Sequence, residues 1–362
     1  MNQKVFEILT AVLFCGFLGA MSLLYLLLPE ETFSDREKRY LAQAPAMERE
    51  SIASGEWGAD AETYMADHIP GRDFFVGLNA YTDLLTGRQV SKDIRVWKDY
   101  LLEAPKTPDF GVIDRNMEKI NGFADLVDQP VDLMIVPSTG WAAGLPGYED
   151  DAVVDRTMET AGENVIPVDL RPVFAGRPEL FYRTDHHWNS EGAYRGCAAY
   201  LSHLGLEPRE EESFQREDAG LFQGSTYSRS ALWLTPGEPM ELWVGSEELT
   251  AVNGENPEPH AGVLYRERLE ELDKYTVFLD GNHSLVRVTN PHGEGKLLVI
   301  RDSFSNSLGC YLGESFGEVV LADLRYYKQP LSQLVEQEGF DRILVCYSTG
   351  NFLTDTNIVM LR

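Results

Sequence analysis

The C-terminal third of the chain alternates between short apolar runs and amphipathic segments. Residues 296–300, 319–321 and 343–347 are rich in Leu, Val and Ile, and helical spacing follows the first two runs. Apolar runs of this length, without polar alternation, are typical of strands buried on both faces of a sheet. Strand, loop and helix in repeated order therefore predict an α/β fold, with a parallel sheet and helices on both faces.

Earlier segments extend this predicted domain. Apolar runs at 131–136 and 165–170 add two further strands, and residues 56–95 read as a helical lead-in. At 362 residues the chain exceeds one average domain, although a single α/β domain with appendages fits this length. We therefore expect one α/β domain over residues 56–362.

Residues 207–295 differ in character from the rest of that domain. They contain charged clusters, Gly and Pro, and short alternating pieces such as 240–244 and 275–279, which read as strands. We expect a β-rich insert here, placed between the earlier strands and the C-terminal strand-loop-helix repeats.

The N-terminus carries an apolar run of 24 positions, residues 5–28, with Glu7 as its one charge. About 20 apolar residues suffice for a helix to cross a bilayer, whereas the core of a cleaved signal peptide spans roughly 7–15. The run therefore predicts an uncleaved membrane anchor at 1–28, with a cleaved signal peptide as the alternative. Residues 29–55 read as a polar linker. We expect a single-pass protein of the cell membrane, with its large domain outside the cytoplasm.

The formal net charge of −27 limits the partners of this chain. An excess of negative charge disfavours binding to nucleic acid and to anionic lipid surfaces. The sequence contains no Cys-x-x-Cys pair and no Cys/His spacing of the kind that binds zinc. We expect no nucleic-acid partner, no metal and no cofactor.

Two adjacent histidines stand in the stretch Arg183-Thr-Asp-His-His-Trp. In an extended segment Asp185 and His187 point the same way and His186 points to the other face. A carboxylate beside an imidazole fixes its tautomer and stabilises its protonated form, as in a Ser-His-Asp triad. A metal site built from Asp185, His186 and His187 is the competing interpretation, but no third and fourth ligand stand at a standard spacing.

Ser303 is the candidate nucleophile for such a triad. It follows the predicted strand at 296–300 and precedes a predicted helix. It therefore lies beyond the carboxyl end of a strand, where parallel sheets carry their active-site residues. Free N–H groups and the helix dipole favour an oxyanion there. A serine needs a base to become nucleophilic, and His187, oriented by Asp185, is the candidate base. The alternative is that Ser303 only caps the helix.

At these residues the chain resembles the bacterial DHHW protein family, named for the tetrapeptide Asp185 to Trp188. The resemblance runs from about residue 35 to the C-terminus and rests on pieces that keep the family order: residues 38–42, 64–72, 183–194, 224–228, 302–304 and 323–327. That family is similar to the SGNH-hydrolase-like alginate O-acetylation proteins of the bacterial periplasm. The resemblance implies an SGNH-hydrolase-like, flavodoxin-like sheet.

The resemblance also implies a function. It assigns Asp185, His187 and Ser303 as catalytic residues, with His186 as a non-catalytic position. It implies a serine-dependent O-acetyltransferase or acetylesterase that acts on a cell-surface polysaccharide outside the cytoplasm. A membrane-bound O-acyltransferase that delivers the acetyl group would be its partner. The alternative is a non-catalytic scaffold or polysaccharide-binding protein with the same fold.

Two features depart from the SGNH pattern. Arg301 stands before Asp302 where the common serine block has glycine, and the usual glycine and asparagine oxyanion donors have no counterpart that the sequence identifies. The Ser303 N–H is the first candidate donor. Asn306, Tyr347 and Ser348 are further candidates for the second donor.

Overall fold

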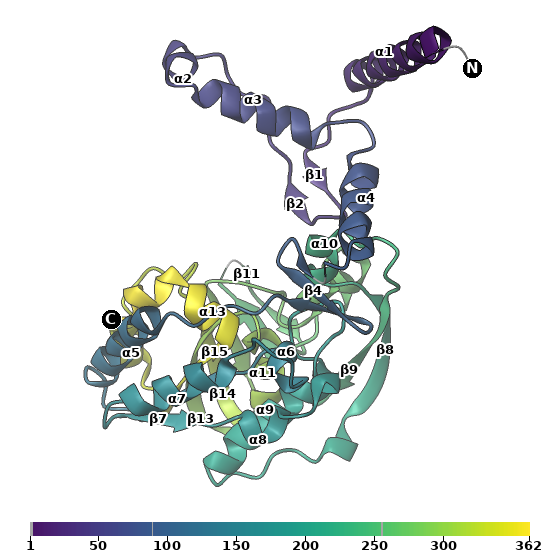
Figure 1. Cartoon of the computed structure of the whole chain (residues 1–362). Coiled ribbons are helices and arrows are strands. Elements are labelled where there is room, and N and C mark those ends of the chain that lie inside the picture. Colours follow the sequence, from purple (N-terminus) through teal and green to yellow (C-terminus); the bar gives the residue numbers. More distant parts are fainter. Residues whose placement is uncertain (1–2, 89, 255) are drawn as a thin grey trace. The chain divides into compact units, whose positions relative to one another are not determined.

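The computed structural model describes residues 3–88, 90–254 and 256–362 (Figure 1). These residues divide into two compact units. The first unit comprises residues 1–92 and 227–235, and the second comprises residues 93–226 and 236–362. The candidate site lies wholly in the second unit.

The first unit is mainly helical. Its elements are α1 (Gln3–Leu27), β1 (Phe33–Ser34), β2 (Arg39–Tyr40), α2 (Arg49–Ser54), α3 (Glu56–Asp67), α4 (Arg72–Leu85) and β3 (Val90–Ser91). Helix α10 (Ser225–Ser230) begins in the second unit and ends in the first. The predicted linker at 29–55 thus contains short strands and a six-residue helix.

Helix α1 is long and apolar enough to cross a membrane, and none of its residues is buried against the rest of the chain. These properties fit a membrane anchor, and they fit a signal sequence equally well.

A buried carboxylate organises the loop between α1 and α3. Asp67, at the end of α3, accepts hydrogen bonds from the Arg39 guanidinium at 2.5 and 2.9 Å and from the Ala42 N–H at 2.9 Å. Arg72 approaches the same carboxylate at 3.5 Å. The hydrogen bonds from Arg39 lower the pKa of Asp67 to about 2, against the opposing effect of burial.

This lowered pKa predicts a pH-dependent stability. Because the folded state lowers the pKa of Asp67 from 3.8 to about 2, its stabilising effect is complete above pH 3.8 and is lost as the pH falls towards 2. Asp67→Asn should lower the melting temperature near neutral pH, and the deficit should shrink over that acid range. Thermal melts followed by circular dichroism test this, with the exposed Asp60→Asn as the control. A deficit independent of pH would contradict it.

The second unit is built on an eight-stranded sheet with the order β11-β10-β12-β14-β13-β15-β6-β7. Strands β14, β13, β15, β6 and β7 run parallel to one another, and β12, β10 and β11 extend one edge in antiparallel fashion. The bounds of these strands are β6 (Val131–Val136), β7 (Val165–Val168), β10 (Thr250–Asn253), β11 (Asn256–Ala261), β12 (Leu285–Thr289), β13 (Glu294–Arg301), β14 (Phe316–Ala322) and β15 (Arg342–Ser348).

The other elements of the second unit cover or flank this sheet. The helices are α5 (Phe110–Ala124), α6 (Thr139–Ala142), α7 (Asp150–Thr160), α8 (Arg171–Phe174), α9 (Ser190–His203), α11 (Ser305–Leu312), α12 (Leu331–Glu338) and α13 (Thr349–Thr354). The remaining strands are β4 (Ile94–Trp97), β5 (Tyr100–Glu103), β8 (Gln215–Phe222) and β9 (Glu238–Val244), and the 3-10 turns are Pro178–Leu180, Glu211–Ser213, Arg266–Glu270, Lys274–Val277 and Thr356–Met360.

Two hydrophobic clusters pack against the two faces of the sheet. One contains residues of α9 and α11, such as Cys197 and Leu308, together with Leu297 and Val299 of β13. The other contains residues of α5, α12 and α13, with the alternate β13 residue Leu298. Because alternate residues of β13 enter different clusters, both faces of the sheet are covered. The expected α/β class, a largely parallel sheet with helices on both faces, is confirmed.

The segment 207–295 contains strands, but they serve two different sheets. Strands β8 and β9 form a separate antiparallel pair, whereas β10, β11 and β12 join the main sheet. The predicted strand at 275–279 is wrong, because Lys274–Val277 is a 3-10 turn. Tyr275 and Val277 are buried there, so the apolar character of the segment reflects core packing.

Candidate active site

Asp185, His187 and Ser303 lie together in the second unit. The His187 Nε2 atom is 2.8 Å from Ser303 Oγ, and its Nδ1 atom is 2.5 Å from Asp185 Oδ1. All three residues are buried. With Asp185 accepting a hydrogen bond from Nδ1–H, the lone pair of Nε2 faces the serine hydroxyl. This is the arrangement that a Ser-His-Asp triad requires.

The loop that carries Asp185 and His187 is irregular. The prediction of an extended strand over 183–188 is wrong, since residues 183–187 form bends. The buried carboxylate of Glu238, in β9, accepts hydrogen bonds from the N–H groups of Arg183 and Thr184 at 2.7–2.9 Å, and from the Thr184 hydroxyl at 2.6 Å. Glu238 therefore holds the start of the loop through its backbone.

Asp185 is fixed at both carboxylate oxygens. Oδ1 accepts the His187 N–H at 2.9 Å in addition to the imidazole, and Oδ2 accepts the Ser225 N–H at 2.6 Å. A Cβ at Gly224 would lie 2.3 Å from Asp185 Oδ2, so the glycine permits this close approach. Burial alone raises the pKa of Asp185, but His187, His186 and these hydrogen bonds outweigh it and hold the pKa well below its ordinary value.

Ser303 lies where the sequence predicted, between the end of β13 and the start of α11. The turn is held by Asp302, whose carboxylate accepts hydrogen bonds from the Phe304 N–H at 3.0 Å and from Ser348 N–H, Ser348 Oγ and Asn351 Nδ2 at 2.8 Å each. Asp302 thus ties the turn to the end of β15 and positions Ser303 without contacting His187.

Aromatic side chains enclose the His187 imidazole. The Tyr275 ring stacks on it with centroids 3.9 Å apart and an angle of 10°, and Phe304 lies at 4.8 Å. The fully buried Trp188 donates through Nε1 to the Phe304 carbonyl at 3.1 Å and to Ser307 Oγ at 2.8 Å. The DHHW tryptophan therefore connects the loop of His187 to the helix that follows Ser303.

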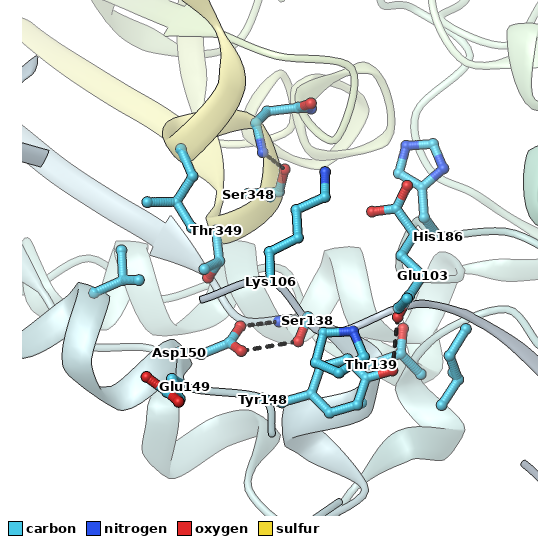
Figure 2. A pocket seen from close by; sticks show the side chains of 18 of the residues that line it. Glu103, Lys106, Ser138, Thr139, Tyr148, Glu149, Asp150, His186, Ser348 and Thr349 are labelled. Carbon is cyan, nitrogen blue, oxygen red and sulfur yellow. Dashed lines mark hydrogen bonds between the residues drawn. The ribbon is translucent and has the colours of Figure 1, made fainter. Parts of the chain in front are cut away.

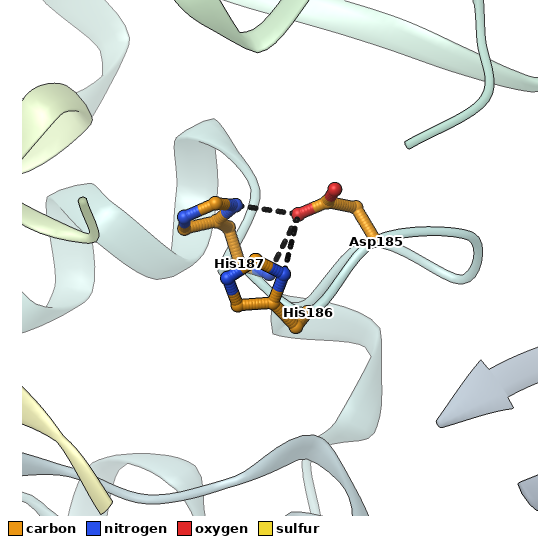
Figure 3. A group of neighbouring side chains, drawn as sticks. All are labelled: Asp185, His186 and His187. Atoms are coloured by element: carbon orange, nitrogen blue, oxygen red, sulfur yellow. Dashed lines mark hydrogen bonds and ion pairs between the residues drawn. The ribbon is translucent and has the colours of Figure 1, made fainter. Parts of the chain in front are cut away.

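His186 does not point away from His187 as the alternation argument predicted. The two imidazole rings have centroids 3.9 Å apart, and His186 Nδ1 lies 3.7 Å from Asp185 Oδ1 (Figure 3). The closer partner of His186 Nδ1 is Ser225 Oγ, at 2.7 Å. Because the loop bends, both histidines turn towards the same carboxylate.

Asp185, His186 and His187 also form a group of metal-ligand type, with ligand atoms within 4.8 Å of one another. However, both ring nitrogens of His187 and both oxygens of Asp185 already make hydrogen bonds. A cation would have to displace these bonds, so the geometry favours a hydrogen-bonded triad over a metal site.

The oxyanion donors are only partly identified by the structure. Within the described residues, the Ser303 N–H has no hydrogen-bond partner, so it remains available for an oxyanion. The Ser348 N–H and hydroxyl are bound to Asp302, Asn306 is bound to Asn282, and Tyr347 belongs to the cluster on the opposite face. None of these three candidates for the second donor offers a group to Ser303.

Arg301, which replaces the usual glycine, is fully buried. Its Nη1 donates to Asn306 Oδ1 and, at 3.4 Å, to Asn282 Oδ1. Its Nε and Nη2 have no hydrogen-bond partner among the described residues. Burial lowers the pKa of Arg301, and the nearby negative charge of Asp323 opposes that effect.

A pocket opens beside the triad. It is bounded by the loop after β5, by the segments that follow β6 and β15, and by Asp185, His186 and Phe304. Figure 2 shows Lys106 extending between Ser348 and Glu103, with His186 nearby. The pocket thus reaches the triad from the side of Asp185 and His186.

Sequence reasoning missed the residues that hold the triad. Tyr275, Glu238 and Asn351 lie 48 to 88 positions from the triad members that they serve. Tyr275 was read as a strand residue, and neither Glu238 nor Asn351 was singled out. Only the resemblance of residues 224–228 to the family pointed towards the Gly224-Ser225 contact with Asp185.

Comparisons with known proteins agree with this architecture. The family model for DHHW protein matches residues 173–322. A solved DHHW family protein from Eubacterium siraeum is 18% identical and has a TM-score of 0.64, over 75% of this chain and 95% of that chain. PatB1 from Bacillus cereus, solved with a sulfonyl adduct, is 20% identical with a TM-score of 0.63, over 74% of this chain and 98% of that chain.

A weaker likeness extends to the O-acetyltransferase domain of AlgJ from Pseudomonas putida. It is 14% identical with a TM-score of 0.44, over 72% of this chain and 92% of that chain, which is too low to support a functional argument. No curated protein sequence matches the chain. The family model for DHHW protein confirms the resemblance found in the sequence over residues 173–322, and the solved structures show that the fold is shared.

Proposed function

We propose that the chain is an acyl-transfer enzyme that uses Ser303 as nucleophile, His187 as base and Asp185 as the group that orients the base. The observation that carries this proposal is the continuous hydrogen-bonded series from Asp185 Oδ1 through His187 to Ser303 Oγ, with distances of 2.5 and 2.8 Å. A merely capping serine would not need an imidazole at its hydroxyl.

The proposed reaction has two steps. In the first, His187 Nε2 takes the proton of Ser303 Oγ, which attacks the acetyl carbonyl, and the Ser303 N–H donates to the resulting oxyanion. The leaving group receives the proton from His187, and acetyl-Ser303 remains. In the second step an acceptor hydroxyl gives its proton to His187, attacks the acetyl-serine and releases the serine oxygen, which recovers the proton.

The acceptor defines the biological activity. A sugar hydroxyl makes the protein an O-acetyltransferase, and water makes it an acetylesterase. We propose a cell-surface polysaccharide as the acceptor on the strength of the family resemblance. With α1 as anchor, the second unit would work outside the cytoplasm, supplied with acetyl groups by a membrane-bound O-acyltransferase.

A non-catalytic role is the second candidate. It is favoured by one observation: none of the three described candidates for a second oxyanion donor, Asn306, Tyr347 and Ser348, offers a group to Ser303. In that case the chain would be a scaffold or a polysaccharide-binding partner of the acyltransferase. The two candidates differ in whether Ser303 becomes acetylated.

Acetylation of Ser303 is the deciding measurement. The full chain, purified in detergent, is incubated with p-nitrophenyl acetate, quenched and digested for mass spectrometry. We expect an acetyl group on the peptide that contains Ser303, and we expect His187→Ala to slow its formation by about 10²- to 10⁴-fold, because the base is removed. A phenylsulfonyl fluoride should label the same serine, a probe suggested by the sulfonyl adduct seen in PatB1.

His292→Ala is the matched control, because His292 is an exposed histidine of the same unit. In this variant Ser303 should become acetylated at the wild-type rate. If wild type and His187→Ala show the same slow background of acetylation, spread over surface lysines and serines, the catalytic proposal is wrong and the scaffold remains.

A further inference from the structure

The pocket beside the triad contains an imidazole that the proposed reaction does not use. His186 lines it together with Asp185 and Phe304. Its Nδ1 is occupied by Ser225 Oγ at 2.7 Å, while its Nε2 has no hydrogen-bond partner among the described residues. Its side chain is 24% exposed, so a ligand in the pocket can reach that nitrogen.

The ring of His186 is held firmly. It packs against the His187 ring, with centroids 3.9 Å apart, and lies 5.8 Å from the Phe304 ring. Burial and the neighbouring His187 lower the pKa of His186. A neutral imidazole fixed at Nδ1 presents one hydrogen-bonding atom in a set direction, which suits recognition of a hydroxyl group.

The charges of the pocket are mixed. Lys106 is exposed, and none of the described carboxylates forms an ion pair with it, although the chain has 58 acidic residues. Glu103, Glu149, Asp150 and Asp185 line the same pocket. A single cation among several carboxylates leaves the pocket with an excess of negative charge, which repels a polyanionic ligand. The Lys106 ammonium needs a hydrogen-bond acceptor, which a sugar hydroxyl supplies and a protonated amine does not.

We propose that this pocket is the acceptor subsite, that it takes an uncharged sugar, and that His186 positions the sugar through its Nε2 atom. Sugar hydroxyls bond equally well to a carboxylate, an ammonium group and an imidazole, so a neutral polyhydroxylated ring satisfies all three kinds of group at once. This inference rests on the proposed acyl transfer. It adds that the acceptor is not a uronate polymer.

In the transfer step His186 is a positioning residue. It holds the acceptor ring while the reacting hydroxyl passes its proton to His187 and attacks acetyl-Ser303, and it exchanges no proton itself. Removing its nitrogen should therefore raise the KM for the acceptor and shift acetyl-Ser303 from transfer towards hydrolysis. Formation of acetyl-Ser303 should fall much less.

The test uses the full chain with p-nitrophenyl acetate and three sets of acceptors: neutral hexose oligosaccharides of several linkages, oligogalacturonates and oligoglucosamines. Mass spectrometry measures the acetylated sugar, and p-nitrophenol release measures the first step. We expect at least one of the neutral hexose oligosaccharides to be acetylated about tenfold faster than any of the charged oligosaccharides. His186→Phe keeps a ring against His187 but loses the nitrogen. This variant should lower the rate of acetyl transfer to the sugar about tenfold more than the rate of p-nitrophenol release, which is the effect expected for one lost hydrogen bond.

Two further variants keep the test decisive. Ser225→Ala removes the partner of His186 Nδ1 but retains the backbone N–H to Asp185, and should raise the acceptor KM by a smaller factor. Lys106→Met should also raise that KM, and His292→Ala should leave both steps unchanged. Melting temperatures identify any variant that fails to fold.

The outcomes separate the two proposals. If Ser303 is never acetylated, the proposed function fails. If Ser303 is acetylated but charged oligosaccharides are the better acceptors, no oligosaccharide is acetylated, or His186→Phe lowers both steps equally, the proposed function stands and the acceptor subsite is wrong.

Discussion

Ser303→Ala is expected to reduce turnover of p-nitrophenyl acetate by about 10⁴- to 10⁶-fold, the range seen when a triad serine is removed. The variant loses the hydroxyl oxygen that lies 2.8 Å from His187 Nε2 and so cannot form the covalent intermediate. Activity above the uncatalysed rate could then come only from the remaining polar groups of the site. Initial rates at saturating ester measure the loss.

The fold should survive this substitution. Ser303 contributes one neutral side-chain hydrogen bond, worth about 1 kcal/mol, and its Asp302-centred turn is held by other residues. The melting temperature should therefore stay close to that of wild type. Ser202→Ala, an exposed change on α9, is the control for activity. Wild-type turnover in Ser303→Ala would exclude this serine as the nucleophile.

Asp185→Asn should lower kcat by about 10⁴-fold while leaving the geometry largely intact, as in the known effect of this change in a serine protease triad. The Asn side chain can present its NH₂ group to the imidazole, so that Nδ1 becomes the acceptor and Nε2 carries the hydrogen. His187 would then no longer accept the proton of Ser303. The lost negative charge also removes the stabilisation of protonated His187.

The pH dependence adds a second readout for Asp185. Because its pKa is held well below the ordinary value of 3.8, the carboxylate stays charged throughout the working range of pH. Activity of wild type should therefore show no loss from Asp185 protonation above pH 3.8. Asp128→Asn, at an exposed position, is the control. If Asp185→Asn retains a tenth or more of wild-type kcat, Asp185 does not orient the base.

The parallel core could be predicted because each of its strands is an uninterrupted apolar run. Strands β6, β13, β14 and β15 lie where those runs lie, within a few residues. The structure of the insert at 207–295 was harder to predict, because β-strand propensity does not distinguish a strand from an irregular buried segment. Residues 275–279 show this: Tyr275 is buried for its contact with His187, and the backbone there forms a turn.

The candidate site was predictable in its reacting groups and not in its supports. Asp185 and His187 carry a local motif, and Ser303 lies at a predicted strand end, so each is visible in the sequence. Glu238 offers no such signal, since its role depends on bringing β9 beside residues 183–184. The orientation of His186 was predicted wrongly, because the prediction assumed an extended backbone. Residues 183–187 form bends instead, and Glu238 holds the start of this loop.

The position of β15 in the sheet determines when, during synthesis of the chain, the candidate site can form. β15 lies between β13 and β6, so the middle one of the five parallel strands is the last strand of this sheet to be synthesised. Contacts over such sequence separations form late, because closing long loops costs entropy before any contact is gained. Asp302, which sets the Ser303 turn, depends on Ser348 and Asn351 from this late strand and its helix. A chain whose synthesis has not yet reached residues 342–351 therefore lacks the contacts that hold the Ser303 turn.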